Sequence, residues 1–344
     1  MNKPIKLGMV GLGRAGKTMH LEELEGKENL FEIYAVCDLK RERSEEFKEK
    51  FGSKIYDSIE ELVEDPEIEV VDIATRSSDH YKHAKTALDA GKTVFLEKPM
   101  SESYEEAKKL IELGEKYGER KLFIRHNRRF EAKFMHLNKI IESGILGDVY
   151  FIRRSVSNFD HRKDWQTLSQ YGGGQLLNWG PHIVDQALRF CGGDYKKMFS
   201  VTRQIAAAGD CEDFILASFE GINGRTVEIE ISGGTAINVP DYIAYGTRGA
   251  LISKGDTYEI KYMPADYTLP NDKASPHTPS GTTFGGNDEI PFITEEKPWE
   301  KNFLDHTWRY LYSAVREGKD YPIKSAEALK VMQTISEIKR QNEK

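Results

Sequence analysis

Two side chains in the sequence are of types that exchange protons, and both stand where the chain pattern predicts a pocket. Lys98 follows an apolar run at 93–96, and a lysine just past a strand can donate a hydrogen bond to a substrate oxygen. Partial burial would lower its pKa and allow proton transfer near neutral pH. His182 lies in a predicted helix and can act as a general acid or base. The alternatives are a surface lysine paired with Glu97 and a histidine with a purely structural role.

His182 has polar neighbours at helical spacing. Asn178 lies four residues before it and Asp185 three residues after it, so all three fall on one stripe of a helix. A polar stripe usually faces solvent, but the glycines at 172–174 that open this helix favour the wall of a pocket. Asn178 can bind a substrate hydroxyl or the imidazole, and Asp185 can orient the helix or the imidazole. We therefore place both among the predicted substrate-binding residues.

A glycine-rich turn near the N-terminus predicts a phosphate-binding loop. Gly11, Gly13 and Gly16 have the spacing G-x-G-x-x-G and follow an apolar run at 5–10. The first glycine permits a tight turn, the second lets a pyrophosphate approach the backbone, and the third lets a helix pack against the strand. Asp38 ends a second apolar run about 20 residues later, where such a site has an acid for the ribose 2′-OH. The alternatives are a plain glycine-rich turn and a flavodoxin-like fold.

Three further loops follow predicted strands, beginning at Arg76, Glu97 and Arg125, and should open on the same edge of the sheet as the glycine turn. The predicted cofactor-binding residues are Gly11, Gly13, Arg14, Ala15, Gly16, Asp38, Thr75, Arg76, His80, Glu97 and Lys98. The predicted substrate-binding residues are Asn127, Arg128, Asp164, Trp165, Asn178 and Asp185, with Arg129, Asp160 and His161 as further candidates. We predict no metal site.

Strand-like and helix-like patterns alternate over the first third of the chain, which predicts a parallel sheet with helices on both faces. Strands are expected at 6–10, 32–37, 54–56, 70–75, 93–96 and 122–125, and helices at 17–24, 58–64 (capped by Asp57), 79–90 and 104–117. We therefore predict an α/β fold, with a Rossmann dinucleotide-binding domain at 1–124.

The second part of the chain has a different pattern. Consecutive strands predict an open, mostly antiparallel sheet, with one helix at 175–190. The strands are expected at 149–156, 200–206, 214–220, 226–231, 242–245, 251–253 and 258–262, a long loop at 265–300, and helices at 131–143, 300–317 and 326–341. We therefore predict an α+β domain at 125–344 that contributes residues to substrate binding.

The composition indicates a globular enzyme. The chain has 344 residues, of which 39% are hydrophobic and 31% charged, with a net charge of −7 and no long block of one sign, which argues against nucleic acid as a partner. No apolar run approaches the ~20 residues of a membrane helix, and we expect no signal peptide. Cys37, Cys191 and Cys211 are widely spaced, which is typical of reduced thiols in the cytoplasm and not of a disulfide framework or zinc site.

The order of these signals resembles the glucose–fructose oxidoreductase and inositol dehydrogenase family, Gfo/Idh/MocA, over essentially the whole chain. The resemblance rests on GLGRAG at 11–16, Asp38, EKP at 97–99, NRRF at 127–130, GGGQLLNWGPHIVD at 172–185 and AVREGKDYPIKSAEALKVM at 314–332. It implies a Rossmann domain followed by an α+β domain with an open sheet. It also implies activity on sugars, cyclitols and related polyols with NAD or NADP, and a homodimer or homotetramer associated through that sheet.

The resemblance assigns roles to residues and reveals two departures. Lys98 would polarise the reacting oxygen and His182 would exchange its proton. Asn178 stands where inositol dehydrogenase-like members have aspartate, which should make His182 a weaker base. Arg76 stands where many relatives have proline, and it has three alternatives: contact with the pyrophosphate, contact with a substrate acid group, or exposure to solvent.

Asp38 predicts NAD, because its carboxylate would repel a 2′-phosphate, while Lys40 and Arg41 leave NADP as the alternative. The predicted function is hydride transfer between a nicotinamide and a secondary alcohol or ketone of a sugar, sugar derivative or cyclitol. One alternative is a redox-neutral, NAD-using enzyme that cleaves or isomerises a glycoside. The other is a non-catalytic sensor of nucleotide or sugar.

Overall fold

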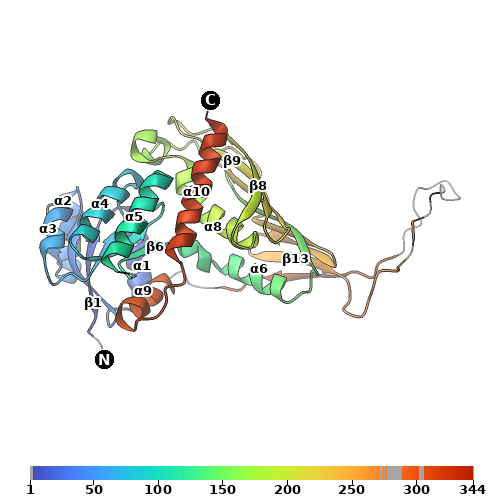
Figure 1. Cartoon of the computed structure of the whole chain (residues 1–344), viewed down its shortest axis with the longest axis horizontal. Helices are drawn as coiled ribbons and strands as arrows, with labels where there is room; N and C mark the ends of the chain where they lie inside the picture. The colour runs from blue at the N-terminus through green and yellow to red at the C-terminus, as the bar shows by residue number, and fades with distance from the viewer. Residues whose placement is uncertain are drawn as a thin grey trace.

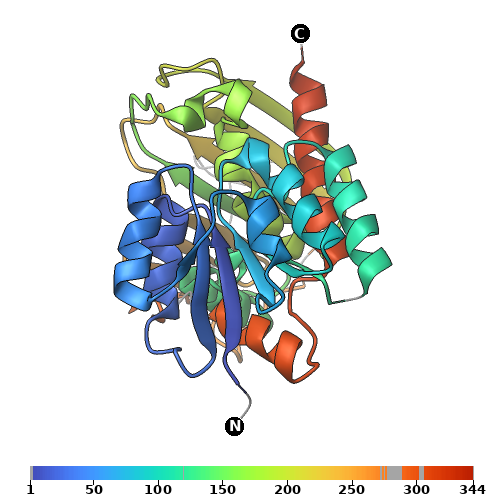
Figure 2. The ribbon, with the colours of Figure 1, turned by 90° about the vertical axis from the view of Figure 1, so that its left-hand side faces the viewer.

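Two β-sheets dominate the computed structural model, which describes residues 3–118, 120–271, 273–274, 276, 289–301 and 306–343. Figure 1 shows a parallel sheet with its helices at one end of the molecule and a larger sheet at the other. The long C-terminal helix α10 (Ser325–Asn342) runs between them. Figure 2 looks onto the molecule from the side of the parallel sheet.

The first sheet is parallel throughout and has the strand order β3-β2-β1-β4-β5-β6, which confirms the predicted Rossmann fold. Its central strands are buried along almost their whole length, because helices cover both faces. The strands are β1 (Ile5–Val10), β2 (Phe31–Cys37), β3 (Lys54–Ile55), β4 (Val70–Ile73), β5 (Thr93–Glu97) and β6 (Leu122–Arg125). The helical segments are η1 (Arg14–His20), α1 (Leu21–Leu24), α2 (Arg41–Phe51), α3 (Ile59–Glu64), α4 (Ser77–Asp89) and α5 (Tyr104–Tyr117).

The second sheet is antiparallel except for one pair, β7 with β10, in agreement with the predicted open sheet. Its order is β14-β13-β12-β11-β7-β10-β9-β8. The strands are β7 (Val149–Ser157), β8 (Tyr195–Arg203), β9 (Phe214–Gly221), β10 (Thr226–Ser232), β11 (Tyr242–Gly246), β12 (Gly249–Lys254), β13 (Thr257–Tyr262) and β14 (Ile293–Pro298).

Helices that precede and follow β7 connect the two sheets. The chain leaves β6 through the turn η2 (Asn127–Phe130) and α6 (Ala132–Glu142), and returns after β7 through η3 (Trp165–Thr167) and η4 (Ser169–Tyr171). The helix predicted at 175–190 is divided at Trp179 into α7 (Gln175–Asn178) and α8 (Gly180–Phe190). Pro181 lies in the first turn of α8, where a missing N–H costs no helical hydrogen bond. One face of α8 packs on β7 and β10.

The last two helices return to the parallel sheet. Trp308 in α9 (His306–Arg316) is fully buried against Phe31 and Phe95, with ring centroids 5.4 and 4.9 Å away. α10 packs on α5, β6, α8 and β8, so it contacts elements of both sheets. These contacts hold the two sheets against each other and thereby define the space between them.

Several boundaries differ from the sequence prediction. Ser58, and not Asp57, caps α3, because its side chain accepts the Glu61 N–H. The helix predicted at 17–24 begins at Arg14, directly after the glycine turn. The helix α2 was not predicted, because its sequence is almost entirely polar and buries only Ser44 and Phe47.

The region around the predicted 265–300 loop contains the largest departure. Its end forms the edge strand β14, which pairs with β13, and much of the rest lies outside the described residues.

The strand β8 begins at Tyr195 instead of residue 200. The helix predicted at 300–317 is described from His306, and residues 302–305 lie outside the described part.

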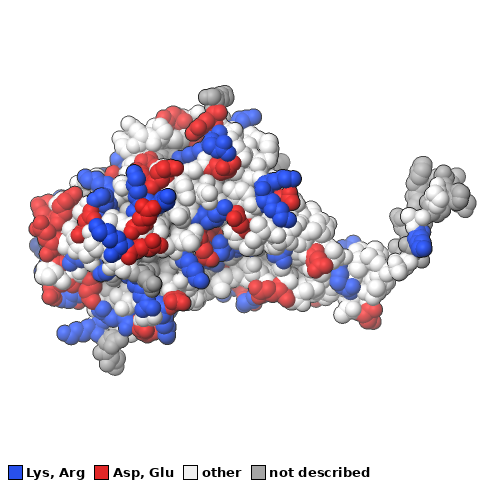
Figure 3. All heavy atoms as spheres, viewed as in Figure 1, with Lys and Arg blue, Asp and Glu red and all other residues white. Residues whose placement is uncertain are grey.

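In the part of the chain that the structure describes, no helix has the length and apolar character needed to cross a bilayer. Figure 3 shows Lys and Arg side chains interspersed with Asp and Glu over the face that carries α10 and α5. The view contains no large patch of a single sign.

Candidate active site

A cleft of about 810 Å³ lies where the carboxyl edge of the parallel sheet faces α7 and α8. Both parts of the chain line it, because the loops after β1, β2, β4, β5 and β6 converge there with residues from 162 to 182. The predicted site residues in its lining are Gly11, Gly13, Arg14, Ala15, Asp38, Thr75, Arg76, His80, Glu97, Lys98, Asn127, Arg128, Asp164, Trp165, Asn178 and His182.

The glycine loop leaves one face of its backbone open to this cleft. Gly11 has a φ of +93°, and a Cβ there would lie 2.7 Å from the backbone of Ala74. A Cβ at Gly16 would lie 2.2 Å from the Gly11 carbonyl oxygen, so the start of η1 packs directly under the turn. Among the described residues, a Cβ at Gly13 would meet only Arg43 Nη1, at 3.7 Å. The surface over Gly13 is therefore accessible to a phosphate group.

The Asp38 carboxylate holds the glycine loop in place. The Leu12 N–H donates to Oδ2 at 2.6 Å, and the Lys40 N–H donates to Oδ1 at 2.8 Å. Arg43 Nη1 lies 3.4 Å from both oxygens, and only 6% of the Asp38 side chain is exposed. Asp38 thus supports the loop as well as facing the cleft, and Arg43 balances part of its charge.

The features of the cleft fit a nicotinamide dinucleotide. The open backbone at Gly13 suits a pyrophosphate, and Asp38 suits a ribose hydroxyl. Deeper in the cleft, Asn127 is 2% exposed, and its buried Oδ1 has no hydrogen-bond partner among the described residues. A buried amide oxygen is costly without a donor, so a bound group with N–H donors would complete this part of the site.

Lys98 lies directly after β5, and its Nζ donates to the Asn178 carbonyl oxygen at 2.9 Å. This bond joins the parallel sheet to α7 across the cleft. The Lys98–Pro99 peptide bond is cis. His80 Nδ1 lies 2.6 Å from the Pro99 carbonyl oxygen and His80 Nε2 lies 3.3 Å from the Thr75 carbonyl oxygen, so this buried ring ties two loops of the cleft together.

The surroundings of Lys98 favour its neutral form more than water does. Burial lowers its pKa to about 8; the Glu97 carboxylate opposes this shift, and the Arg128 and Arg125 guanidinium groups add to it. A lysine with this pKa exists in both protonation states near neutral pH, so it can donate or accept a proton there.

A buried cluster of charged residues lies beneath Lys98. Glu97 Oε1 is an acceptor for Arg125, which also contacts Glu23, and lies 2.9 Å from His20 Nε2. The other ring nitrogen of His20 lies 2.8 Å from Asp72 Oδ2. Burial opposes ionisation, but Arg125 and His20 hold the pKa of Glu97 well below its usual value. Glu97 therefore stays ionised, and its negative charge is held in a fixed position beneath Lys98.

His182 is buried in the wall of the cleft, and its Nδ1 has no hydrogen-bond partner among the described residues. Burial, together with the Lys98 and Arg128 cations, keeps its pKa well below the usual value. The imidazole is therefore neutral at physiological pH. It can form a hydrogen bond with a substrate hydroxyl, but it binds a proton weakly.

The end of the cleft near α7 is rich in polar groups. Gln166 Nε2 donates to Asn178 Oδ1 at 3.3 Å, and Gln166 Oε1 accepts from Arg162. Arg162 also pairs with Asp164, 3.0 Å away, and Asp164 caps η3 through the Gln166 N–H. These side chains form one hydrogen-bonded group in the lining of the cleft.

Arg128 closes the same end of the cleft. Its guanidinium lies over the Trp179 ring, 4.4 Å from the centroid, and Nη1 donates to Glu131 at 3.0 Å. Trp179 also contacts His182 edge-on, with ring centroids 6.0 Å apart. The stacked arrangement fixes a cation beside both candidate catalytic residues.

Comparison with known families decides what kind of protein has this cleft. Residues 5–126 match the model of the oxidoreductase family with an NAD-binding Rossmann fold, and residues 134–252 match the model of the Gfo/Idh/MocA C-terminal domain. The chain belongs to the Gfo/Idh/MocA family. It is therefore an oxidoreductase that uses a nicotinamide cofactor, as the sequence motifs predict.

Curated relatives cover most of this Gfo/Idh/MocA chain. The scyllo-inositol 2-dehydrogenase (NADP⁺) IolW of Bacillus subtilis is 27% identical over 340 residues, which are 96% of this chain and 92% of IolW. The myo-inositol 2-dehydrogenase of Thermotoga maritima is 30% identical over 218 residues, or 62% of this chain and 64% of that enzyme. The crystal structure of an NAD-binding protein of Listeria innocua, 24% identical, has the same fold, with a TM-score of 0.83 over 98% of this chain and 95% of that one.

Two predicted site residues of this family member do not line the cleft. Gly16 is buried beneath the glycine turn, where it shapes the loop. Asp185 is 1% exposed and accepts from Arg129 Nε at 3.0 Å, while Arg129 also pairs with Glu327 of α10. Asp185 thus anchors α8, the helix of His182, to the rest of the fold instead of facing a ligand.

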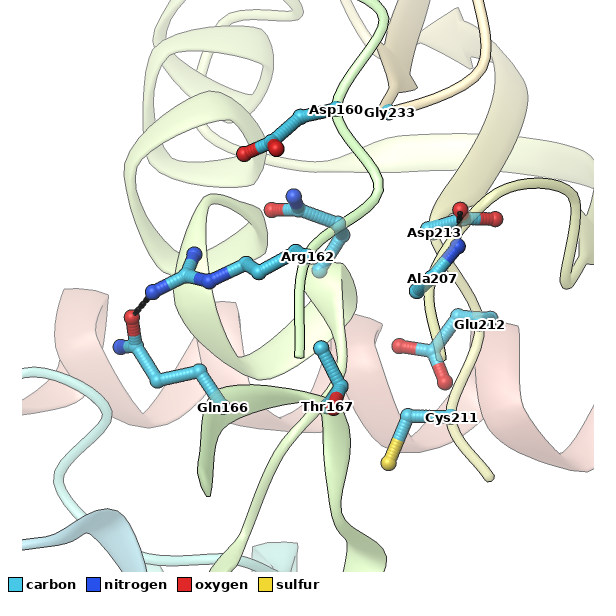
Figure 4. A pocket seen from close by; sticks show the side chains of 10 residues that line it. Asp160, Arg162, Gln166, Thr167, Ala207, Cys211, Glu212, Asp213 and Gly233 are labelled. Carbon is cyan, nitrogen blue, oxygen red and sulfur yellow. Dashed lines mark hydrogen bonds between the residues drawn. The ribbon is translucent and has the colours of Figure 1, made fainter. Parts of the chain in front are cut away.

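The further candidates Asp160 and His161 also lie outside the main cleft. Asp160 lines a separate cavity of about 20 Å³, shown in Figure 4, which has Arg162 and Gln166 on one side and Cys211 and Glu212 on the other. His161 Nδ1 lies 2.6 Å from the Ala206 carbonyl oxygen. No group of three or more His, Cys, Asp or Glu side chains that could hold a metal occurs in the described ranges.

Arg43, Arg162 and Gln166 are among the charged or polar residues of the cleft that were not predicted from the sequence. Arg43 was missed because its helix, α2, was not predicted; its place five residues after Asp38 is the signal that would have found it. Arg162 and Gln166 flank the predicted residues Asp164 and Trp165, but they lie outside any periodic segment. Only the fold brings them beside Asn178.

Proposed function

We propose that this enzyme transfers hydride between NAD and a secondary alcohol or ketone of a sugar, sugar derivative or cyclitol. One observation carries the proposal: Lys98, with a pKa of about 8, and the neutral His182 line the same cleft as the open glycine loop. The inositol dehydrogenases among the relatives act on compounds of this class.

We assign the proton exchange to Lys98 instead of His182. Its pKa lies closer to neutrality than that of His182, and a general base works best when its pKa is near the working pH. The Asn178 carbonyl oxygen accepts a hydrogen bond from the Lys98 amine and holds that amine in place. The remaining hydrogen-bonding positions of the amine are available to the substrate. In oxidation, the hydroxyl proton of the substrate passes to the neutral Lys98 amine, and the C–O bond becomes a carbonyl.

His182 and Asn178 orient the substrate in this scheme. The neutral imidazole can accept a hydrogen bond from a second hydroxyl or donate one to it. Its buried Nδ1, which has no partner among the residues that the structure describes, belongs to the same wall of the cleft. The bound nicotinamide supplies the acceptor or donor of hydride. Glu97, held ionised by Arg125 and His20, keeps the Lys98 pKa from falling further.

For the cofactor, we propose NAD ahead of NADP. The Asp38 carboxylate is fixed by two backbone N–H groups and disfavours a 2′-phosphate at this position. Arg43, 3.4 Å from Asp38, could bind such a phosphate if Asp38 were absent, and Lys40 lines the same cleft. The IolW relative is named for NADP⁺. The preference therefore depends on one carboxylate.

We also propose a homo-oligomer that associates through the face of the second sheet turned away from α8. This face carries Tyr245, 40% exposed and stacked on Phe151, and Phe199, 63% exposed. A Tyr245→Glu variant should be smaller by light scattering than the wild type. Ile222→Glu, which changes an exposed loop residue, is the matched control.

The catalytic proposal is tested by the absorbance of the reduced nicotinamide. NAD and NADP would each be offered with a panel of aldoses, glycosides, inositols and sugar acids. Lys98→Met should bind cofactor normally but lose turnover, while Lys108→Met, at an exposed position on α5, should keep both. Wild-type turnover that survives in Lys98→Met would refute the assignment.

A further inference from the structure

We propose that the substrate of this enzyme carries a carboxylate, so that a sugar acid is preferred over the corresponding neutral polyol. This inference rests on the function proposed above and narrows its substrate class. It follows from the direction of the hydrogen bonds and from the balance of charges at the end of the cleft formed by Arg128, Arg162, Gln166 and Asn178.

The orientation of the Asn178 amide is determined by a chain of donors. Arg162 has only N–H groups, so the group of Gln166 that faces it must be the oxygen, as Figure 4 shows. The Gln166 Nε2 then faces Asn178 at 3.3 Å, and because it is a donor it requires the Asn178 oxygen. Arg162 therefore sets the direction of both amides.

The Asn178 oxygen consequently faces Gln166, and the N–H groups of this amide are the donors it offers to a ligand in the cleft. Among the described residues, Asn178 Nδ2 has one long contact, 3.5 Å to Gln175 Oε1, which leaves donor capacity unused. In the same part of the chain, Arg128 uses Nη1 for Glu131 and stacks on Trp179, so the rest of its guanidinium is available as well. Both residues line the cleft.

Cations that line this end outnumber the carboxylates that line it. Lys98, Arg128 and Arg162 are in the lining together with Glu97 and Asp164. Arg128 also pairs with Glu131, outside the lining, but Arg154 shares that carboxylate. Glu97 is paired with Arg125 and His20 in a cluster that also holds Glu23 and Asp72, and Asp164 is paired with Arg162 and caps η3. The lowered pKa values of Lys98 and His182, to which Arg128 contributes in both cases, agree with a cationic environment.

A carboxylate matches this arrangement better than hydroxyl groups do. Its oxygens only accept, so they can satisfy Asn178 Nδ2 and the Arg128 guanidinium together, and bonds to an ion are stronger than bonds between neutral groups. A polyol hydroxyl must also place its own hydrogen, whereas an ionised carboxylate has no hydrogen to place. A neutral substrate would therefore leave cationic donors poorly satisfied in a partly buried site.

The test uses matched pairs that differ in the acid group. Glucuronate with glucose, galacturonate with galactose, gluconate with glucitol and mannonate with mannitol would be assayed with NAD for kcat/KM. We expect the acid of any active pair to exceed its neutral partner by at least about tenfold, because a site built from donors rejects a ligand without matching acceptors. Asn178→Asp should reduce this ratio by about tenfold or more, since it replaces a donor with a negative charge. Asn238→Asp, an exposed position outside the cleft, should leave the ratio unchanged.

The outcomes separate the two proposals. Equal or greater kcat/KM for the neutral partners would overturn the carboxylate inference and leave the dehydrogenase function intact. If no pair is turned over, the wider panel of glycosides and inositols described above tests the dehydrogenase function separately. Calorimetric binding of the same pairs to NAD-saturated protein then decides this inference. Tighter binding of the acids that Asn178→Asp abolishes would support it, and equal or absent binding would overturn it.

Discussion

Replacing Lys98 by arginine should almost abolish activity although the positive charge is kept. With a pKa of about 8, about one-tenth of the Lys98 side chains are neutral at pH 7 and about nine-tenths at pH 9. An arginine, whose pKa lies above about 12, has a neutral fraction below about 0.1% at pH 9. If the neutral amine accepts the substrate proton, kcat/KM for oxidation should fall by about 10²–10⁴-fold in Lys98→Arg.

The assay is the pH dependence of alcohol oxidation between pH 6 and 10 at constant ionic strength. For the wild type, kcat/KM should rise about tenfold from pH 7 to pH 9 and then level off, because the active form is the deprotonated one. An unperturbed lysine would instead give a rise that continues to about pH 10.4. Cofactor binding and the melting temperature of Lys98→Arg should match the wild type, which separates lost chemistry from lost structure.

Two results would refute this reasoning. If Lys98→Arg keeps activity within a few fold of the wild type, Lys98 serves as a cationic donor and proton exchange belongs to another group. If wild-type oxidation declines as the pH rises through 8, the ammonium form is the active one. In either case His182 becomes the proton acceptor, despite its low proton affinity.

Three further predictions test the cofactor site and its support. Gly13→Ala should melt like the wild type, because the new Cβ meets only Arg43 Nη1, at 3.7 Å, in the described protein. It should bind NADH much more weakly in a fluorescence titration, because the Cβ covers the surface that a phosphate would contact. Equal affinity would contradict the assignment of the loop. Arg125→Met should lower the free energy of unfolding in urea by about 3–5 kcal/mol, since it removes the buried cation shared by the buried Glu97 and the partly buried Glu23. A change below about 1 kcal/mol would show that the cluster relaxes, as surface pairs do. Asp38→Ser should raise the ratio of kcat/KM with NADP to kcat/KM with NAD by at least about tenfold, because it removes the charge that opposes a 2′-phosphate. An unchanged ratio would show that Asp38 only holds the glycine loop in place through its backbone hydrogen bonds.

The local features of the site were predictable because their physical causes are local. The glycine turn requires a positive φ at Gly11 and a close approach at Gly16, and both demands appear as residue type at fixed spacing. The strands of the parallel sheet appear as short apolar runs because both faces are covered. The cap of α3 was misplaced by one residue, from Ser58 to Asp57, because both side chains are good caps and only the backbone decides between them.

The features that were not predictable depend on contacts between distant parts of the chain. Helical spacing put Asp185 on the same stripe as His182, but Arg129 draws it into a buried ion pair away from the cleft. Gln166 showed no periodic signal, yet it contacts Asn178 twelve residues later. β14 is a polar edge strand that exists because β13 offers free backbone groups, and its sequence alone is typical of a loop.

The sequence by itself determined the two-sheet architecture, the dinucleotide loop, the acid at Asp38 and the positions of Lys98 and His182 in the chain, because each follows from residue type, periodicity or spacing over short distances. Only the tertiary structure decided what these residues can do. The pKa of Lys98 depends on burial and on Arg128 and Glu97. The direction in which the Lys98 amine points depends on its hydrogen bond to the Asn178 carbonyl, 80 residues away in sequence. Charge–charge and hydrogen-bond energies depend on distance in space, and only folding sets that distance.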